Sequence, residues 1–536
     1  MSYIFSILSG ILYFLSFPKF NFSFLIWICF LPLFYLFLDI KFNSHTLSKK
    51  IQLKKVILYS LISAFVGNVG ILYWIVPTFK FAGENIFWGV ISCFLLSLYC
   101  SIYFVIFSLY FYIFYNEKNR FIFLISSSIF WLLLEYIRSD FLSGFPWMLL
   151  GYSQYKNLKI IQIAEFFGVY GISFVIIFFN LCLATTIFEI LKFKKYKSFK
   201  YFCLSILVLT FFVIFGSLRI KKINRLINNS NNKITVVILQ GNIDQYKKWD
   251  KQYIQEIVDK YTQMVISSYK EILNNRKNFS NLVLYIWPES SLPGYFFEEE
   301  KIFSWVKDLV SLTNKDLVSY HLLGTPRLGI KNEYYNCAIL VSFKEQEFKV
   351  ENIYNKIHLV PFGEFVPFRN ILGRFINVIN ELGEFSKGEN YTIFEINPSV
   401  KFSVIICYES IFSELTSKFV KKTANFLVNI TNDAWFLKTS APYQHFSFNI
   451  LRAVENRVYL FRSANTGISA VISPTGEILK QTKLFTDEKI IFNTNLWHKK
   501  TFYTKYNSYL KLISVIIFVI LNIILLKKTY GNFFKK

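Results

Sequence analysis

The sequence lacks the paired cysteines and the histidine–cysteine clusters that build structural metal sites. Its seven cysteines include no pair at the spacing Cys-x-x-Cys, so we expect no zinc site, no other metal and no cofactor. Five of the seven lie in apolar segments, where a thiol is ordinarily a small buried side chain. Only Cys337 and Cys407 lie in the more polar second half of the chain and are candidates for a reactive thiol.

Charged residues are scarce as well, and acidic residues most of all. Charged residues make up 17% of the 536 residues, hydrophobic residues make up 54%, and the mean hydropathy is +0.38. This composition excludes a disordered chain and indicates a membrane protein. The 59 Lys and Arg outnumber the 34 Asp and Glu, an excess that in another chain could indicate nucleic acid. Many of the lysines lie in short loops between apolar segments, so we expect no nucleic-acid partner.

Eight apolar segments approach the length of a membrane span, which is about 20 residues. They lie near residues 3–18, 22–40, 56–77, 86–115, 121–137, 161–191, 201–218 and 508–526, and the first is short. Seven spans are therefore expected before a soluble region and one after it. The predicted organisation is a membrane domain at 1–219, a linker at 220–233, a catalytic domain at 234–505, and a final span with a basic tail at 506–536.

Lysine-rich loops predict the orientation of these spans. The loops at 41–55, 116–120 and 192–200 and the tail from residue 527 fall on one side if the spans alternate. An excess of Lys and Arg in short loops marks the cytoplasmic side. The soluble domain is then expected on the outer face of the membrane. Basic residues at 219–225 run against this assignment, but long translocated domains largely escape the charge rule.

The second half of the chain has the pattern of a layered α/β domain. Helical stretches such as 250–275 and 443–456 separate several short runs rich in β-branched residues. Strands that alternate with helices indicate this fold class. The predicted strands are 234–240, 282–288, 321–325, 336–342, 402–407, 426–431, 458–464 and 468–473.

Three chemically different groups end apolar runs in this domain: Glu289, Lys356 and Cys407. A thiol becomes a strong nucleophile when a base removes its proton. A fixed ammonium beside the thiol would favour the thiolate and stabilise the oxyanion of a tetrahedral intermediate. The combination therefore suggests a cysteine acyl-transfer site.

Histidine is an alternative base. His321, His358 and His445 all lie in the predicted soluble domain, so a Cys–His dyad competes with Glu289. Glu289 follows a proline and opens a loop rich in Ser, Pro and Gly. Loops at strand ends are where α/β folds carry functional groups, and Glu289 is therefore preferred.

The ordered set of motifs resembles the nitrilase, or carbon–nitrogen hydrolase, superfamily. The motifs are Trp-Pro-Glu at 287–289, Tyr-Asn-Lys at 354–356 with Pro-Phe-Gly-Glu at 361–364, and Cys-Tyr-Glu at 407–409. With the flanking spans, the chain resembles the apolipoprotein N-acyltransferase family. Further segments that carry this resemblance lie at 144–147, 151–154, 240–245, 248–249, 429–436 and 462–467. The resemblance implies a polytopic α-helical membrane domain plus a nitrilase-like α-β-β-α sandwich.

The resemblance also implies residue roles. Glu289 would be the general base, Lys356 the oxyanion-stabilising cation and Cys407 the nucleophile, with Glu364 supporting the lysine. The same likeness gives three residues an accessory role: Tyr408 and Glu409 in shaping the pocket, and Trp249 in substrate binding on a mobile loop.

The implied reaction adds an acyl chain to the N-terminal diacylglyceryl-cysteine of bacterial lipoproteins. A glycerophospholipid would donate the chain through a ping-pong thioester mechanism, and a monomer is expected. One rival is a membrane-tethered amidase or nitrilase that uses the same three residues with water. A second rival, a transporter with a binding domain, needs functional charges within the spans, for which Glu135 and Glu165 are the few candidates.

Overall fold

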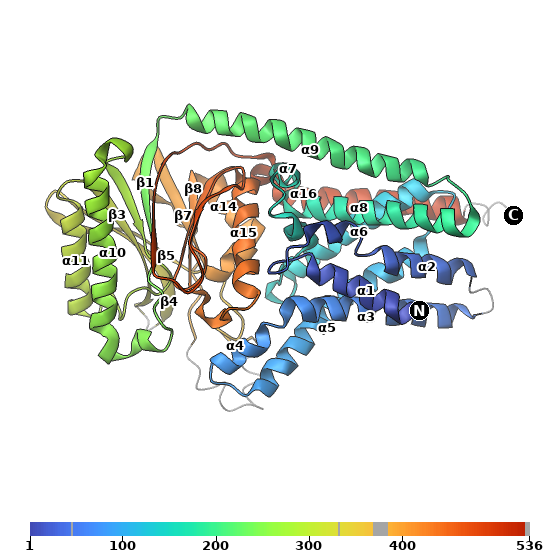
Figure 1. Ribbon diagram of the computed structural model, residues 1–536, viewed down its shortest axis with the longest axis horizontal. Coiled ribbons are helices and arrows are strands. Elements are labelled where there is room, and N and C mark those ends of the chain that lie inside the picture. The colour runs from blue at the N-terminus through green and yellow to red at the C-terminus, as the bar shows by residue number, and fades with distance from the viewer. Residues whose placement is uncertain (44–46, 331–332, 368–383, 531–536) are drawn as a thin grey trace. The chain divides into compact units, whose positions relative to one another are not determined.

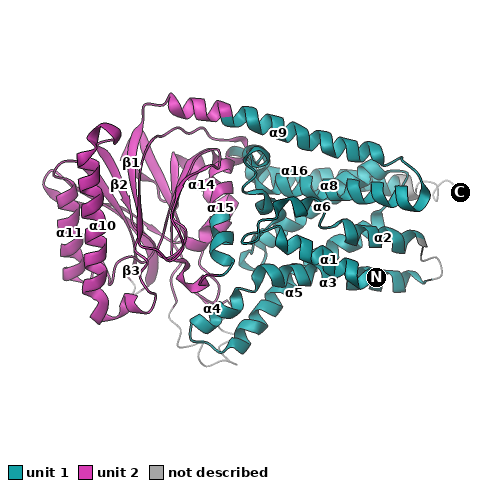
Figure 2. Ribbon diagram, in the orientation of Figure 1, with its two compact units in different colours: residues 1–220, 439–447, 505–536 teal, residues 221–438, 448–504 magenta. Residues whose placement is uncertain are grey.

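The structure, a computed structural model, describes residues 1–43, 47–330, 333–367 and 384–530. His45, Lys535 and Lys536 lie outside the described residues. The chain forms two compact units (Figure 2). The helical unit comprises Met1–Ile220, Thr439–Ser447 and Lys505–Lys536, and the sheet unit comprises Lys221–Lys438 and Phe448–Thr504.

The helical unit is built from long apolar helices (Figure 1). Seven helical segments of the described chain are long and apolar enough to cross a membrane, six before the sheet unit and one after it. Their helices are α2 (Leu31–Asn43), α3 (Lys49–Leu72) with α4 (Ile75–Phe81), α5 (Ile86–Phe114), α6 (Arg120–Asp140), α8 (Ala164–Phe193), α9 (Phe199–Asn228) and α16 (Phe502–Tyr530). The unit also contains α1 (Ser2–Leu15) and α7 (Leu158–Ile161).

The first predicted span differs from the prediction. Helix α1 has 14 residues, which is about 21 Å at 1.5 Å per residue. A bilayer core is about 30 Å thick, so α1 is too short to count among the spans. The alternation of the later segments does not depend on α1, and the orientation predicted from the lysine-rich loops is unchanged.

The linker predicted at 220–233 is mostly helix. Helix α9 continues to Asn228, and β1 begins at Lys233. Apolar residues at 220, 223, 226 and 227 recur at helical spacing, and Ile223 and Ile227 are buried. The linker was predicted because the segment ends in a run rich in asparagine. Only the few residues between α9 and β1 are irregular.

A second boundary differs as well. The predicted catalytic domain runs unbroken through 234–505, whereas residues Thr439–Ser447 belong to the helical unit. Within that unit the Gln444 amide donates to the carbonyls of Pro18 and Ile71, both at 3.1 Å, and accepts from Trp147 Nε1 at 2.8 Å. Three buried hydrogen bonds from one side chain explain why the segment clusters with the membrane helices. His445 therefore belongs to the helical unit and not to the sheet unit.

The two acidic residues that would support a transporter have structural partners. Glu135 accepts from Trp131 Nε1 and from the Leu150 amide, both at 3.0 Å. Glu165 pairs with Arg219 at 2.7 Å. Contacts of this kind brace helices and loops, and they give no support to an ion pathway.

The sheet unit contains two six-stranded sheets. The first has the order β12-β1-β2-β3-β4-β5 and the second the order β11-β10-β9-β8-β7-β6. In each sheet three neighbouring strands are parallel and the outer pairs are antiparallel. The strands are β1 (Lys233–Gln240), β2 (Leu282–Ile286), β3 (Val318–Leu328), β4 (Tyr334–Lys344), β5 (Glu347–Asn355), β6 (Phe394–Asn397), β7 (Val400–Ile406), β8 (Phe426–Thr431), β9 (Tyr459–Ala464), β10 (Ala470–Ile472), β11 (Ile478–Gln481) and β12 (Glu488–Asn495).

Helices cover the outer face of each sheet, as Figure 1 shows. Helices α10 (Ile254–Asn274) and α11 (Glu300–Thr313) pack on the first sheet. Helix α14 (Ser413–Lys422) packs on the second, and α15 (Ala441–Asn456) begins in the helical unit and ends in the sheet unit. Residues such as Val237, Tyr261 and Val310 form a buried apolar core between α10, α11 and the first sheet. The unit is the predicted α-β-β-α sandwich.

All eight predicted strands are present. Four further strands, β5, β6, β11 and β12, were not predicted, and each forms an edge of its sheet. Strands β5 and β11 carry several charged or polar residues. An edge position needs less apolar surface, so these strands give a weak hydrophobic signal.

Candidate active site

Glu289, Lys356 and Cys407 each follow the carboxyl end of a different strand. Glu289 comes three residues after β2, Lys356 directly after β5, and Cys407 directly after β7. The structure brings these three residues together: Lys356 Nζ lies 3.6 Å from Glu289 Oε1, and the charges of both Glu289 and Lys356 act on the Cys407 thiol. Loops at strand ends hold functional groups on a rigid scaffold.

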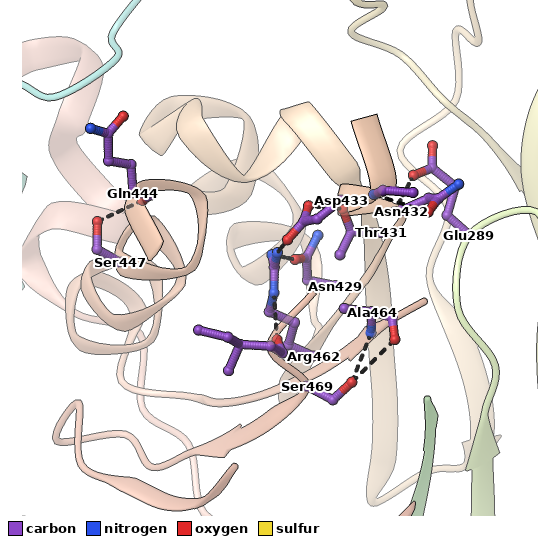
Figure 3. Close-up of polar contacts among 12 residues, drawn as sticks. Glu289, Asn429, Thr431, Asn432, Asp433, Gln444, Ser447, Arg462, Ala464 and Ser469 are labelled. Atoms are coloured by element: carbon purple, nitrogen blue, oxygen red, sulfur yellow. Dashed lines mark hydrogen bonds and ion pairs between the residues drawn. The ribbon is translucent and has the colours of Figure 1, made fainter. Parts of the chain in front are cut away.

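The Glu289 carboxylate is held from two directions. Its Oε1 accepts from Asn336 Nδ2 at 2.8 Å, and its Oε2 accepts from the Asn432 amide at 2.8 Å. Figure 3 shows the contact with Asn432, which comes from the loop after β8. Both oxygens of this buried carboxylate are therefore oriented, which limits its motion relative to the site.

Lys356 is buried among acceptors. Its ammonium donates to Glu364 Oε1 at 2.9 Å and lies 2.8 Å from Glu364 Oε2. Burial alone would lower the lysine pKa, but the carboxylates of Glu364 and Glu289 outweigh it and hold the pKa of Lys356 above its ordinary value. The ammonium therefore keeps its charge throughout the physiological range, as an oxyanion-stabilising group must.

Cys407 occupies a strained turn. Its φ is 51°, in the left-handed region that non-glycine residues seldom adopt. Such a turn directly after a strand is typical of a functional side chain whose position is fixed by the fold.

The thiol is not a thiolate at rest. Loss of solvent, reinforced by the Glu289 carboxylate, raises the pKa of the Cys407 thiol above its ordinary value, although Lys356 and the Thr431 hydroxyl oppose the rise. At neutral pH the thiol is protonated, so attack requires a base that takes the proton as the bond forms. The surroundings therefore favour general-base chemistry over a resting ion pair.

Glu364 connects the two charged groups. Its Oε1 accepts from Asn336 Nδ2 at 2.8 Å in addition to Lys356, and its Oε2 accepts from the Val360 amide at 2.8 Å. Asn336 thus donates to Glu364 and to Glu289 from one side-chain amide. One ammonium and one amide are therefore shared between two carboxylates.

Glu409 is completely buried and accepts four hydrogen bonds. Its Oε1 accepts from the Tyr354 hydroxyl at 2.8 Å and from the amides of Ile357 and His358 at 2.8 and 3.0 Å. Its Oε2 accepts from the Ile406 amide at 2.7 Å. One carboxylate therefore joins the segment after the candidate lysine to the residue before the candidate cysteine.

Two of the residues named from the sequence lie at the margin of this cluster. The Tyr408 ring packs edge-on against Phe412, with ring centres 5.3 Å apart. Trp249 is exposed, and its ring lies 6.2 Å from that of Tyr295. Neither contact tests the roles expected of them in pocket shape and substrate binding, which remain predictions.

Two of the histidines considered as alternative bases have other environments. His321 is buried in β3, where its Nδ1 lies 3.3 Å from Trp287 Nε1, and burial lowers its pKa to about 3. The His358 ring packs against Phe412 with ring centres 3.7 Å apart. These surroundings favour Glu289 as the base.

A buried polar network lies beside the candidate nucleophile. Arg462 on β9 donates from Nη2 to Asp433 Oδ2 at 2.7 Å and also contacts Asn429 (Figure 3). The Asp433 carboxylate in turn accepts from the Thr431 hydroxyl at 3.1 Å. The ion pair fixes the loop after β8, and this loop supplies the Asn432 amide that orients Glu289.

Asn336 and Asn432 were missed as site residues by sequence reasoning. Asn336 lies inside the predicted strand 336–342, where a polar side chain on an apolar run gave the only available signal. Asn432 acts through its backbone amide, which no residue type reveals. Within the described ranges of the chain no cluster of His, Cys, Asp or Glu has the arrangement of a metal site.

The class of protein follows from the fold and from two family matches. Residues 235–496 match the family described as carbon–nitrogen hydrolase, and residues 9–182 match the apolipoprotein N-acyltransferase N-terminal domain. The molecule is therefore a nitrilase-like α/β domain combined with several long apolar helices, as the sequence predicted.

Curated relatives extend over most of the chain. A protein of Geobacter metallireducens named apolipoprotein N-acyltransferase is 34% identical over 512 residues, which cover 94% of this chain and 91% of the relative. Proteins with the same name from Wigglesworthia glossinidia brevipalpis and Rickettsia prowazekii are 32% and 30% identical, and the matches cover 84% and 77% of this chain and 85% and 78% of the relatives. The chain belongs to the apolipoprotein N-acyltransferase family and is an acyltransferase.

Proposed function

We propose that this acyltransferase moves an acyl chain from a glycerophospholipid to the N-terminal amine of a diacylglyceryl-cysteine lipoprotein, through a thioester on Cys407. The observation that carries the proposal is the convergence of Glu289, Lys356 and Cys407 in one buried cluster, with Glu364 beside the lysine. The acceptor follows the names of the curated relatives.

In the first half-reaction Glu289 takes the proton of the Cys407 thiol as the sulfur attacks the ester carbonyl of the donor. The Lys356 ammonium stabilises the oxyanion of the tetrahedral intermediate. The intermediate collapses by breaking the bond to the glycerol oxygen, which receives the proton from Glu289. The products are a thioester on the cysteine and a lysophospholipid.

In the second half-reaction the lipoprotein amine attacks the thioester carbonyl. Glu289 accepts a proton from the attacking nitrogen, and Lys356 again stabilises the oxyanion. Breaking of the carbon–sulfur bond forms the amide and returns the cysteine, which regains its proton from Glu289. Glu364 supports the lysine in both steps, and Glu409 holds the two loops together.

A membrane location fits both substrates, since extracting a lipid chain into water costs about 0.8 kcal/mol per CH₂ group. The lysine-rich loops favour a sheet unit on the periplasmic face of the inner membrane. In intact spheroplasts a tag in the loop at 192–200 should be protected from protease, and a tag at 298–301 should be cleaved. Cleavage at 192–200 would invert the orientation. A monomer completes the proposal, because one sheet unit supplies all three residues.

The decisive measurement is the decay of the acyl-enzyme. Purified full-length protein is loaded with phospholipid, and the thioester on Cys407 is followed by mass spectrometry. We expect it to persist for minutes in water and to clear rapidly when a diacylated lipopeptide with a free amine is added. An N-acetylated lipopeptide should not clear it, because its nitrogen is no longer nucleophilic. Cys407→Ala should form no thioester, and Cys337→Ala, which removes a thiol buried in β4, should form it normally.

Rapid decay without any acceptor, with release of free fatty acid, would instead indicate a lipid hydrolase. That is the rival in which the same three residues use water. A thioester on Cys337 would move the site to the other thiol of the sheet unit.

A further inference from the structure

Lys248 is buried where its neighbours are exposed. It lies in a short 3-10 turn, Lys247–Trp249, in the loop after β1. Its side chain is 2% exposed, whereas Trp249 is 47% and Tyr246 is 59% exposed. Transfer free energies favour the opposite arrangement, with the aromatic rings inside and the ammonium in water. The fold therefore keeps this ammonium inside while the rings of two neighbouring residues stay largely exposed.

The buried ammonium points at the candidate base. Lys248 Nζ donates to the backbone carbonyl of Glu289 at 3.2 Å. In the part of the chain that the structure describes, no carboxylate forms an ion pair with Lys248. Burying a charge without a paired counter-ion costs several kcal/mol. Such a cost is typical of a group kept for a function and not for stability.

The loop that carries Lys248 is anchored on the same site. Asn432 Nδ2 donates to Gln245 Oε1 at 2.5 Å, and its backbone amide holds Glu289. The Asn465 side chain accepts from the Ile243 amide at 2.9 Å and donates to the Ile243 carbonyl at 2.8 Å. Hydrogen bonds from Asn432 and Asn465 therefore hold the loop that carries Lys248.

We propose that Lys248 is a positioning residue, which fixes the peptide of Glu289 and so keeps its carboxylate aimed at Cys407. This inference rests on the proposed role of Glu289 as general base. The contacts from Asn336 and Asn432 orient the two carboxylate oxygens, and Lys248 restrains the backbone from which that side chain extends. A misplacement of about 1 Å at such a group can reduce a rate by about 10²-fold.

The lysine also titrates in an accessible range. Burial lowers the pKa of Lys248 to about 8, although the Glu289 carboxylate opposes the shift. On its own loop the nearest charged neighbour, Lys247, faces Glu256 at 3.9 Å, and Asp244 accepts the Lys247 amide. Glu289 is therefore the charged group that Lys248 faces. Above about pH 8 the ammonium becomes an amine, and its hydrogen bond to the carbonyl weakens.

The test measures formation of the Cys407 thioester by full-length protein in mixed micelles of phosphatidylethanolamine and phosphatidylglycerol. We expect Lys248→Met to lower the rate at saturating donor by about tenfold or more, with little change in the donor concentration at half-maximal rate. Lys248→Arg should restore most of the rate, because it keeps a charged donor. Lys247→Met, which removes the exposed lysine next in the chain, is the matched control and should stay within about twofold.

The pH profile separates positioning from general support of the fold. Arginine stays charged at every accessible pH, so the ratio of the native rate to the Lys248→Arg rate should fall as the pH rises through about 8. A flat ratio between pH 6 and 10 would overturn the inference, even if Lys248→Met fails to fold. So would a folded Lys248→Met protein with the native rate. If Glu289→Gln forms the thioester at the native rate, the proposed function is refuted. If Glu289→Gln forms no thioester while Lys248→Met forms it at the native rate, only the role of Lys248 is refuted.

Discussion

The helical unit and the sheet unit both bury one-to-one ion pairs, but the sheet unit also contains a buried lysine that two carboxylates share. In the helical unit the buried Arg120 faces the buried Glu189, with the exposed Glu117 3.9 Å away, and in the sheet unit Arg462 faces Asp433. Lys356 of the sheet unit faces both Glu289 and Glu364.

A one-to-one pair neutralises itself and braces the helices around it. Of the two carboxylates that share Lys356, Glu289 also acts on the Cys407 thiol, so it is the candidate proton acceptor. Buried ion pairs are weak indicators of function on their own. The comparison suggests that two carboxylates sharing one ammonium beside a thiol indicate chemistry better than a closed ion pair does.

The outer surfaces of the two units differ in a second way. Exposed large apolar residues of the helical unit lie along whole helices, for example Leu207, Phe211 and Leu218 on α9. Those of the sheet unit are scattered singly, for example in loops at Trp249, Phe297 and Phe362 and at strand positions Val318, Tyr334 and Val350. A lipid solvent permits apolar side chains all around a helix, whereas water confines them in the sheet unit to local positions.

The largest expected effect comes from removing the charge of Glu289, one of the two carboxylates that face Lys356. Glu289→Gln should slow formation of the Cys407 thioester by about 10²–10⁴-fold, because an amide cannot accept the thiol proton. The variant should remain folded, since glutamine keeps the shape of the side chain. The measurement is the thioester rate by mass spectrometry, with His358→Ala as the control that retains most of the rate. If His358→Ala were as slow as Glu289→Gln, a Cys–His dyad would be the better account.

Breaking a buried one-to-one ion pair should instead reduce the stability of the fold and leave the reaction rate unchanged. Arg120→Met leaves Glu189 buried without its partner, as the two side chains are 6% and 5% exposed. The expected loss of stability is about 3–5 kcal/mol, with an unchanged thioester rate per folded molecule. Thermal unfolding in detergent measures it. Lys511→Met is the matched control in the same unit, where the exposed pair with Asp140 (27% and 62% exposed) should be worth at most about 1 kcal/mol. Equal losses of stability in Arg120→Met and Lys511→Met would show that the buried ion pair is worth no more than the exposed one.

The smallest effect concerns a buried group that stays uncharged. Burial holds the pKa of His321 at about 3, below its ordinary value of 6.5. Above pH 6.5 the ring is neutral in both the folded and the unfolded chain. As the pH falls from 6.5 towards 3 only the unfolded chain takes up the proton, so stability falls by up to about 1.4 kcal/mol per pH unit. His321→Asn removes this proton uptake, and its melting temperature should depend less steeply on pH below 6.5. An unchanged slope would show that other groups govern acid unfolding.

The sequence predicted the apolar helices and the layered α/β class from simple periodicities, and the α-β-β-α sandwich from the family resemblance. Apolar runs about 20 residues long and alternating strands and helices need no tertiary information. The placement of Glu289, Lys356 and Cys407 after strands was also visible, although β5, the strand before Lys356, was not among the predicted strands.

The rest of the site depended on contacts between distant segments. Asn336, Asn432 and Lys248 each reach Glu289 across at least 41 residues of sequence. An asparagine in a strand, a backbone amide and a lysine in a loop have no pattern that distinguishes them from ordinary residues of those types. The same limit explains why residues 439–447 were assigned to the wrong unit, since the hydrogen bonds of Gln444 determine their membership.

The four hydrogen bonds accepted by Glu409 have a practical consequence for capturing substrates. This carboxylate holds the turn at Cys407 to the segment that follows Lys356. Changing the –CH₂–SH group to –CH₃ therefore removes the reactive atom and leaves the hydrogen bonds of Glu409 in place. An inert Cys407→Ala protein should still bind a phospholipid without consuming it. Such a protein would be a suitable bait for crystallising the intact donor and for extracting the preferred lipid from native membranes.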